Sequence, residues 1–147
     1  MTIAELMQDH HRHCDAEFVE AEDALRRGRW DAGRFLLEAF GRDLERHFTA
    51  EEEILFPAFE RATGMHEGPT QMMRYEHSQV RNMFAQMVAA AVAEDGDEFA
   101  GAAETLLVLV QQHNAKEENI LYPMCDSALD ADTVTQDLRQ RLKGGAS

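Results

Sequence analysis

Two histidine and glutamate pairs with the same spacing are the residues of this chain best suited to chemistry. His47 precedes Glu51 by four positions, and His113 precedes Glu117 by four positions. Because a helix turns by about 100° per residue, positions i and i+4 lie on one face. Each pair can therefore direct an imidazole and a carboxylate at one point. Such mixed nitrogen and oxygen donors suit iron, manganese, zinc and cobalt, so each pair predicts one wall of a metal site.

Each pair stands in an eleven-residue stretch that occurs twice, 66 positions apart. Residues 47–57 read HFTAEEEILFP, and residues 113–123 read HNAKEENILYP. A duplication that kept only its packing would need the shared isoleucine and leucine, but it would not need the shared histidine and glutamates. The repeat therefore favours a metal site. The pair His13 and Glu17 has the same spacing without this context, and we interpret it as accidental.

Length and composition are those of one globular domain. The chain has 147 residues, 44% of them hydrophobic, which is enough for a core at about 3–127 with a tail at 128–147. With 14 basic and 28 acidic residues, the net charge is −14, which argues against nucleic acid and anionic membranes as partners. Two distant cysteines and the lack of a visible secretion signal predict a reducing, cytoplasmic location. The sequence does not indicate an oligomeric state.

Turn signals divide the chain into four long segments with helical periodicity. The turns lie at Gly28, at Gly64 to Pro69 and at Asp95 to Asp97, and they leave segments at about 3–27, 31–62, 69–94 and 97–127. Four long helices with short connections predict an all-α, up-down-up-down four-helix bundle, and a short C-terminal helix is expected after Asp130. Pro57 and Pro123 each predict a kink or an end of a helix six residues past a ligand glutamate.

The 66-residue offset also relates the first segment to the third. It pairs Met7 with Met73 and Phe18 with Phe84, and it pairs His11 with His77. His77 lies on an apolar stripe that faces the same interior as the two His-Glu pairs. The predicted metal ligands are therefore His11, His47, Glu51, His77, His113 and Glu117.

The choice between His10 and His11 rests on two signals that disagree. The dipeptide Asp9-His10 resembles Glu76-His77, which favours His10, whereas the apolar residues around His11 match those around His77. We predict His11 as the ligand, with His10 as the alternative. A helix would place His13 on another face, so His13 should be dispensable.

Four imidazoles and two carboxylates exceed what one ion needs. They predict two ions about 3.5–4 Å apart, with both carboxylates bridging and two imidazoles on each ion. An oxide or hydroxide bridge would absorb the remaining charge. No cysteine belongs to the set, so a structural zinc site is not expected. Glu52 and Glu118 are expected either in solvent or holding an imidazole N–H. Packing is the expected role of Tyr122, because its repeat counterpart Phe56 has no hydroxyl. The alternative is that its hydroxyl donates to bound oxygen or quenches a radical.

The order His, His-x-x-x-Glu, His, His-x-x-x-Glu, with Leu-Phe-Pro or Leu-Tyr-Pro after each pair, resembles the hemerythrin-like (HHE cation-binding) family over about residues 5–125. The resemblance implies a four-helix bundle that holds a non-haem di-iron centre. It implies terminal ligation by His11, His47, His77 and His113, and bridging by Glu51 and Glu117.

One departure from that family affects the expected function. Oxygen-carrying members have a fifth histidine where this chain has Arg81, and a bridging aspartate one position after Glu117. The chain is thus similar to the branch with four histidines and two glutamates. That branch implies binding of iron and a small diatomic ligand, oxygen or nitric oxide, for sensing, scavenging or iron handling. A di-iron peroxidase or catalase-like enzyme that consumes hydrogen peroxide, and iron storage or delivery for repair of iron centres, are the alternatives.

Overall fold

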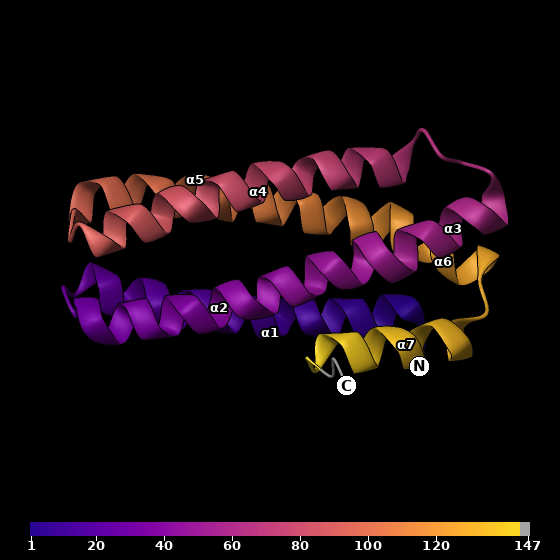
Figure 1. Ribbon diagram of the computed structural model, residues 1–147, viewed down its shortest axis with the longest axis horizontal. Coiled ribbons are helices and arrows are strands. Elements are labelled where there is room, and N and C mark those ends of the chain that lie inside the picture. The colour runs from indigo at the N-terminus through magenta and orange to yellow at the C-terminus, as the bar shows by residue number, and fades with distance from the viewer. Residues whose placement is uncertain (145–147) are drawn as a thin grey trace.

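The described residues, 1–144, form helices and connecting turns and contain no strand (Figure 1). The structure is a computed structural model. Its elements are α1 (Ile3–Arg26), α2 (Trp30–Ala50), η1 (Glu51–Leu55), α3 (Phe56–Thr63), α4 (Pro69–Val92), α5 (Gly96–Lys116), η2 (Glu117–Leu121), α6 (Tyr122–Ala128) and α7 (Ala131–Leu142). The two η elements are π-helical turns within longer helices.

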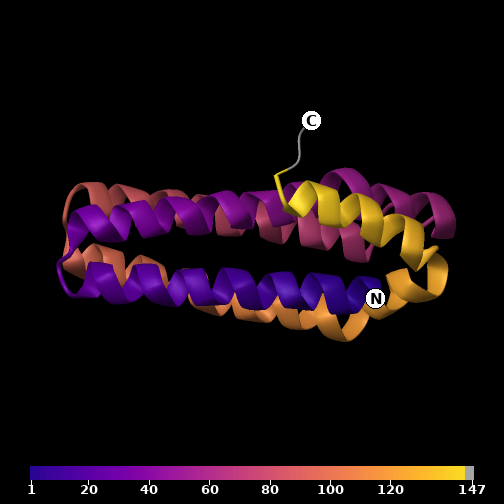
Figure 2. The same ribbon diagram turned by 90° about the horizontal axis from the view of Figure 1, so that it is seen from below.

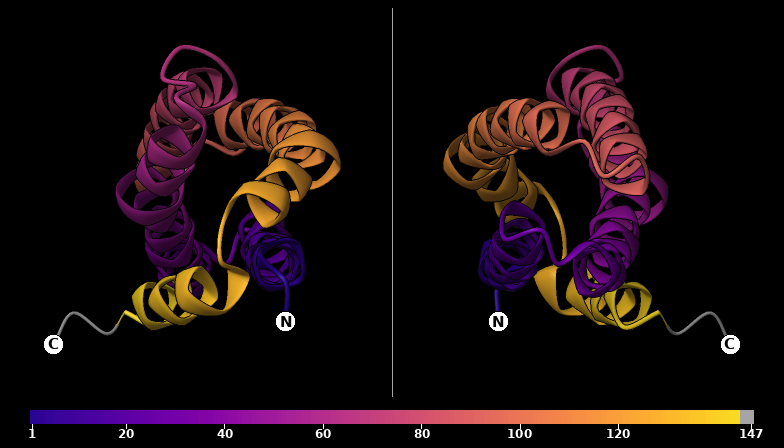
Figure 3. Two further views of the ribbon diagram at one scale, coloured as in Figure 1. Left: turned by 90° about the vertical axis from the view of Figure 1, so that its right-hand side faces the viewer. Right: turned by 90° about the vertical axis from the view of Figure 1, so that its left-hand side faces the viewer.

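The long helices form an up-down-up-down bundle made of two hairpins. Helix α1 packs on α2 and α4 packs on α5, while α2 with α4 and α1 with α5 close the ring. The end views show this ring, and the view from below shows α7 lying along the outside of the bundle (Figures 2 and 3). The predicted fold class is confirmed, and each predicted segment agrees with its helix within two residues. Residues 145–147 of the expected tail lie outside the described residues.

The core consists of two apolar clusters with a layer of polar residues between them. One cluster, which includes Phe18, Phe40 and Phe99, fills the end near the α1–α2 and α4–α5 turns. The other includes Ile3 and Leu138 and fills the end beneath α3, α6 and α7. Burial of each such side chain contributes about 1.5–3 kcal/mol, so the apolar clusters stabilise the frame that holds the polar layer. Within residues 1–144, no helix is long and apolar enough to cross a bilayer.

Side chains accept hydrogen bonds from the backbone N–H groups at the start of α1. Thr2 accepts from the backbone N–H of Glu5 at the start of α1. Asp126 on α6 accepts from the N–H groups of Ile3 and Ala4 at 2.8 and 3.1 Å, so the first turn of α1 is tied to α6. These hydrogen bonds fix the position of α1 along the bundle axis. They therefore fix the positions of its histidines along that axis as well.

The two prolines produce a wider helical turn and do not end either helix. The N–H of Phe56 donates to the carbonyl of Glu51, and the N–H of Tyr122 donates to the carbonyl of Glu117, five residues back in each case. Proline has no N–H to continue the α-helical pattern, so one extra residue is accommodated just before it. The alternative of a helix end is wrong, because each helix continues through a π-helical turn. Each turn begins at a predicted ligand, and such turns often occur at functional sites.

Candidate metal centre

The six predicted ligands meet in the polar layer at the middle of the bundle. Their relative exposures are 0% for Glu51, His77 and Glu117, 2% for His47 and His113, and 5% for His11. They come from α1, α2, η1, α4, α5 and η2, so each of the four long helices contributes a histidine. Ionisable side chains are almost never buried this deeply without a partner of opposite charge or a metal.

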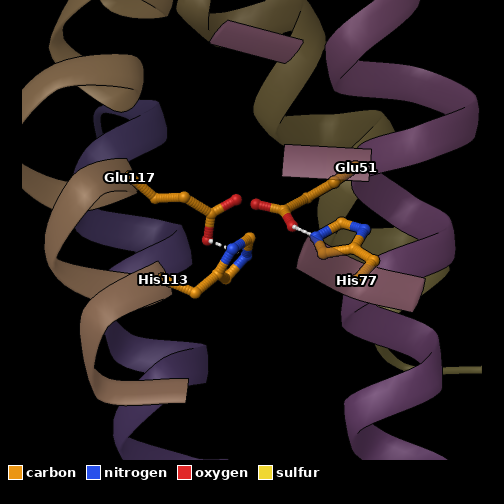
Figure 4. Close-up of side chains that lie close together, drawn as sticks. All are labelled: Glu51, His77, His113 and Glu117. Atoms are coloured by element: carbon orange, nitrogen blue, oxygen red, sulfur yellow. Dashed lines mark ion pairs between the residues drawn. The ribbon is translucent and has the colours of Figure 1, made fainter. Parts of the chain in front are cut away.

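Each glutamate lies between a histidine of its own helix and one of another helix. Glu51 oxygens lie 3.0 Å from His77 Nε2 and 3.5 Å from His47 Nε2. The oxygen Oε1 of Glu117 lies 3.2 Å from His11 Nε2 and 3.3 Å from His113 Nε2. The two carboxylates point toward one another across the bundle axis (Figure 4).

The donor atoms fall into two overlapping groups, which we call the α4–α5 position and the α1–α2 position. In the α4–α5 position, one atom each of Glu51, His77, His113 and Glu117 lie within 4.8 Å of one another. In the α1–α2 position, the same holds for His11, His47 and Glu117. The carboxylate of Glu117 belongs to both groups. The arrangement thus contains two candidate cation positions with one carboxylate in common.

Buried atoms without a partner show that the group fits a metal. Glu51 Oε1, His77 Nε2, His113 Nε2 and Glu117 Oε2 are buried, and none of them has a hydrogen-bond partner among the described residues. A buried polar atom left unpaired costs about 1–3 kcal/mol, and more when it is charged. Cations between these atoms would satisfy all four.

Three of the imidazoles donate a hydrogen bond from Nδ1 to a carboxylate on the side away from the donor group. Nδ1 of His77 donates to Glu52 at 2.7 Å, and Nδ1 of His11 donates to Glu118 at 2.6 Å. This is one of the two roles expected for these glutamates. Nδ1 of His113 donates to Glu76 at 2.8 Å, a contact that sequence reasoning missed. A proton on Nδ1 leaves the lone pair of Nε2 for a metal, so these contacts select the binding tautomer.

The geometry distinguishes the three N-terminal histidines. His11 is in the donor group, whereas His10 lies behind His47, with 2.9 Å between their Nδ1 atoms. Burial and the imidazoles of His47 and His13 lower the pKa of His10 to about 3, so its ring is neutral. His13 is 3.4 Å from Glu17 and 2.9 Å from Asp43 in a separate, partly exposed group.

Protons and charges are shared within the metal-free group. Burial alone would raise the pKa of the Glu51 carboxyl, but His47, Glu117 and His77 hold it well below its usual value. Burial alone would lower the pKa of His113, but the adjoining carboxylates outweigh burial and raise that pKa to about 9. A cation that binds through the neutral imidazole of His113 would therefore release the proton of that ring, as is general for sites that ligate through histidine.

Tyr122 does more than pack, which corrects the expectation from sequence. The side chain is fully buried, and its hydroxyl oxygen lies 2.6 Å from Glu51 Oε2 and 2.9 Å from Glu117 Oε1. The same oxygen is 3.2 Å from His11 Nε2 and 3.3 Å from His47 Nε2. It therefore stands among the donor atoms of the α1–α2 position. Burial and the two carboxylates raise the pKa of Tyr122 well above its usual value, so the hydroxyl keeps its proton.

Replacing Tyr122 by phenylalanine will destabilise the metal-free protein by about 1–3 kcal/mol, because Glu51 and Glu117 lose their hydroxyl donor. For a chain of this size, that corresponds to a fall in melting temperature of about 2–12 °C. Cations replace the lost donor in the metal-loaded protein, so the fall there will be smaller. The control is Tyr75→Phe, whose side chain is 63% exposed and whose melting temperature should not change. Equal losses in both metal states would contradict this assignment.

Comparison with known proteins agrees with this geometry. A DNA nickase from Nostoc sp. (strain PCC 7120 / SAG 25.82 / UTEX 2576) is 26% identical over 160 residues, covering 100% of this chain and 43% of the nickase. The chain thus spans less than half the length of that relative. No solved structure matches the chain. The family described as "Hemerythrin HHE cation binding domain" matches residues 2–125, and the chain belongs to this family of cation-binding proteins.

Proposed function

We propose that this chain is a non-haem di-iron protein. The observation that carries the proposal is the meeting of four imidazoles and two carboxylates in two overlapping groups, with four buried donor atoms left without partners. In this proposal His11 and His47 cap one iron, His77 and His113 cap the other, and Glu51 and Glu117 bridge them. Membership of a cation-binding family supports it. When bound, the two ions would supply redox chemistry and open coordination positions for a small ligand.

We further propose that the ligand is a small diatomic molecule, oxygen or nitric oxide. A cavity of about 10 Å³, close to the room that one water molecule needs, adjoins three of the imidazoles. Its lining includes His11, His47 and His113 together with Asp15 and Asn114 at its outer side. A space of this size admits only the smallest ligands and disfavours a larger substrate. Sensing, scavenging and iron handling are the roles such binding would serve.

Nucleic acid and membrane are not proposed as partners of this chain. Its net charge of −14 disfavours binding to the phosphates of DNA or of anionic lipids. The nickase that resembles it has more than half of its length outside the match, so nicking is not transferred to this segment. Cys14 and Cys125 are free and buried, which fits a reducing compartment, and we propose a cytoplasmic location.

Metal analysis tests the proposal directly. The chelated protein is loaded with Fe(II) without oxygen, desalted and analysed for iron, and we expect two ions per chain. One ion or fewer would refute the di-iron centre. Exposure of the loaded protein to nitric oxide should then give a stable, stoichiometric spectral change. Sustained loss of hydrogen peroxide at catalytic rates would instead favour a peroxidase.

Reversible oxygen carriage is expected to fail. Arg81 stands where oxygen-carrying relatives have a fifth histidine, and its guanidinium binds Glu45 and Glu52 at 2.8 to 3.0 Å. One iron would therefore have fewer protein donors and stay open to water. The Fe(II)-loaded protein should oxidise in air to a stable ferric form. A spectrum that vanishes on degassing and returns with oxygen would contradict this expectation.

A further inference from the structure

The 66-residue repeat relates the two halves of the centre as well as its ligands. The repeat pairs His11 with His77, His47 with His113, Glu51 with Glu117, and Glu52 with Glu118. The contacts follow the same relation, because Glu118 holds His11 just as Glu52 holds His77. The halves can therefore be compared position by position.

The two halves differ in the residue that contacts Nδ1 of one pair of equivalent imidazoles, His113 and His47. Glu76 accepts from His113 Nδ1, but the residue 66 positions before Glu76 is His10. His10 occupies the equivalent place, with its Nδ1 2.9 Å from Nδ1 of His47. Only one proton fits between these two nitrogens. If His47 binds a cation through Nε2, that proton is on His47, and His10 accepts it as a neutral ring.

A neutral acceptor supports a ligand imidazole less than a carboxylate does. A carboxylate behind a histidine fixes the ring and raises its basicity, and loss of such a partner typically costs about 10–100-fold in metal affinity. The Tyr122 hydroxyl also lies among the donors of the α1–α2 position, 3.2 Å from His11 and 3.3 Å from His47, and must be accommodated when a cation enters.

Two basic side chains, Lys116 and Arg81, should weaken metal binding at the α4–α5 position, but their effect is smaller than that of His10. Lys116 binds Glu76 and Arg81 binds Glu52, which reduces the negative charge near the α4–α5 position. Their side chains are 44% and 33% exposed, so water and salt screen them. The contact on His47 is direct and part-buried, and it reaches an imidazole that is itself buried, so it outweighs the two screened ion pairs.

We propose that His10 makes the α1–α2 position the weaker and more readily exchanged of the two metal positions, so that the α4–α5 position fills first. The inference rests on the proposed di-iron function and extends it. His10 is a positioning residue in this scheme, because it acts through His47 and touches no metal itself.

Stepwise binding of Co(II) to the chelated protein tests this order without any turnover. Calorimetry and visible absorption should show two steps, with the second Kd at least about tenfold above the first. The variant His47→Ala should keep the tight step and lose the weak one. The variant His113→Ala should lose the tight step.

Exchanging the supporting groups gives the sharper test. His10→Glu places a carboxylate where the repeat has one at Glu76, and it should lower the second Kd by about tenfold. Glu76→His should raise the first Kd by a similar factor. His10→Gln keeps a neutral acceptor and should leave the two steps separated. The matched control is His13→Glu, which adds the same charge to α1 but faces Asp43 rather than His47, so it should change neither step.

The outcomes separate this inference from the proposed function. Two equal Kd values in the unmodified protein would overturn the inference alone. So would a His10→Glu variant that leaves the second Kd unchanged. An equal fall of the second Kd in His13→Glu would also overturn it, because long-range charge would then explain the effect. Failure of the unmodified protein to bind any Co(II) would overturn the metal centre itself and this inference with it.

Discussion

Removing the metal with a chelator will lower the melting temperature by about 8–16 °C. A cation that binds only the folded chain, at a free concentration about a thousand times its Kd, stabilises the chain by about 4 kcal/mol. For a domain of this size, each kcal/mol corresponds to about 2–4 °C. The effect is large because removal leaves Glu51 and Glu117, both 0% exposed, in the core with only imidazoles and one hydroxyl around them. Differential scanning calorimetry before and after verified metal removal measures it.

Readdition of Fe(II) without oxygen should restore the original melting temperature, which distinguishes metal loss from damage. Glu51→Gln serves as a second control, because a centre that lacks this carboxylate should gain less from metal and lose less on chelation. An unchanged melting curve after complete removal would show that the metal sits at the surface, for example at the exposed group of His13, Glu17 and Asp43.

The helices and the donor set could be predicted from sequence because two independent patterns agree on them. Helical periodicity with glycine and proline at the turns places the four long helices, and the 66-residue repeat places histidines on the interior of each. His11 could be preferred over His10 because Met7 and Phe18 match the apolar frame of His77. Packing of the apolar frame then decides which imidazole faces inward.

The supporting contacts could not be predicted because they depend on where neighbouring helices meet. Glu76 reaches His113 across α4 and α5, and His10 reaches His47 across α1 and α2, and no spacing within one helix reveals either contact. The repeat also misled in one place. Phe56 has no hydroxyl, so its counterpart Tyr122 looked like packing, although the single added oxygen lies between both carboxylates.

The widened turns illustrate a further limit of sequence reasoning. Proline indicates where the α-helical hydrogen bonds must fail, but it does not indicate whether the helix ends there or continues through a wider turn. In both copies the chain widens, and the apolar residues on either side explain why it goes on as a helix. Leu55 and Phe56 are fully buried, and so is Tyr122, so ending the helix would remove them from the core.

Glu117→Gln will reduce the iron content from two ions to one. Among the described residues, the α1–α2 group has one carboxylate, that of Glu117. Without it this position would depend on His11, His47 and the proposed bridge from Glu51, which lies outside that group, whereas the α4–α5 position keeps Glu51 within its own group together with two imidazoles. Glutamine has nearly the same volume, so the loss reflects chemistry and not a cavity. Iron analysis after anaerobic loading and desalting measures it.

Its neighbours provide matched controls for this prediction. Glu118→Gln replaces the carboxylate behind His11 with a neutral acceptor and should weaken binding by about 10–100-fold while both ions still bind at high Fe(II). Glu53→Gln changes an exposed glutamate that pairs with Arg141, and it should leave iron binding unchanged. If Glu117→Gln retained two ions, Glu117 would not be shared between the two positions. The ions would then have to be held by Glu51 and the imidazoles alone, and the bridging role assigned to Glu117 would be wrong.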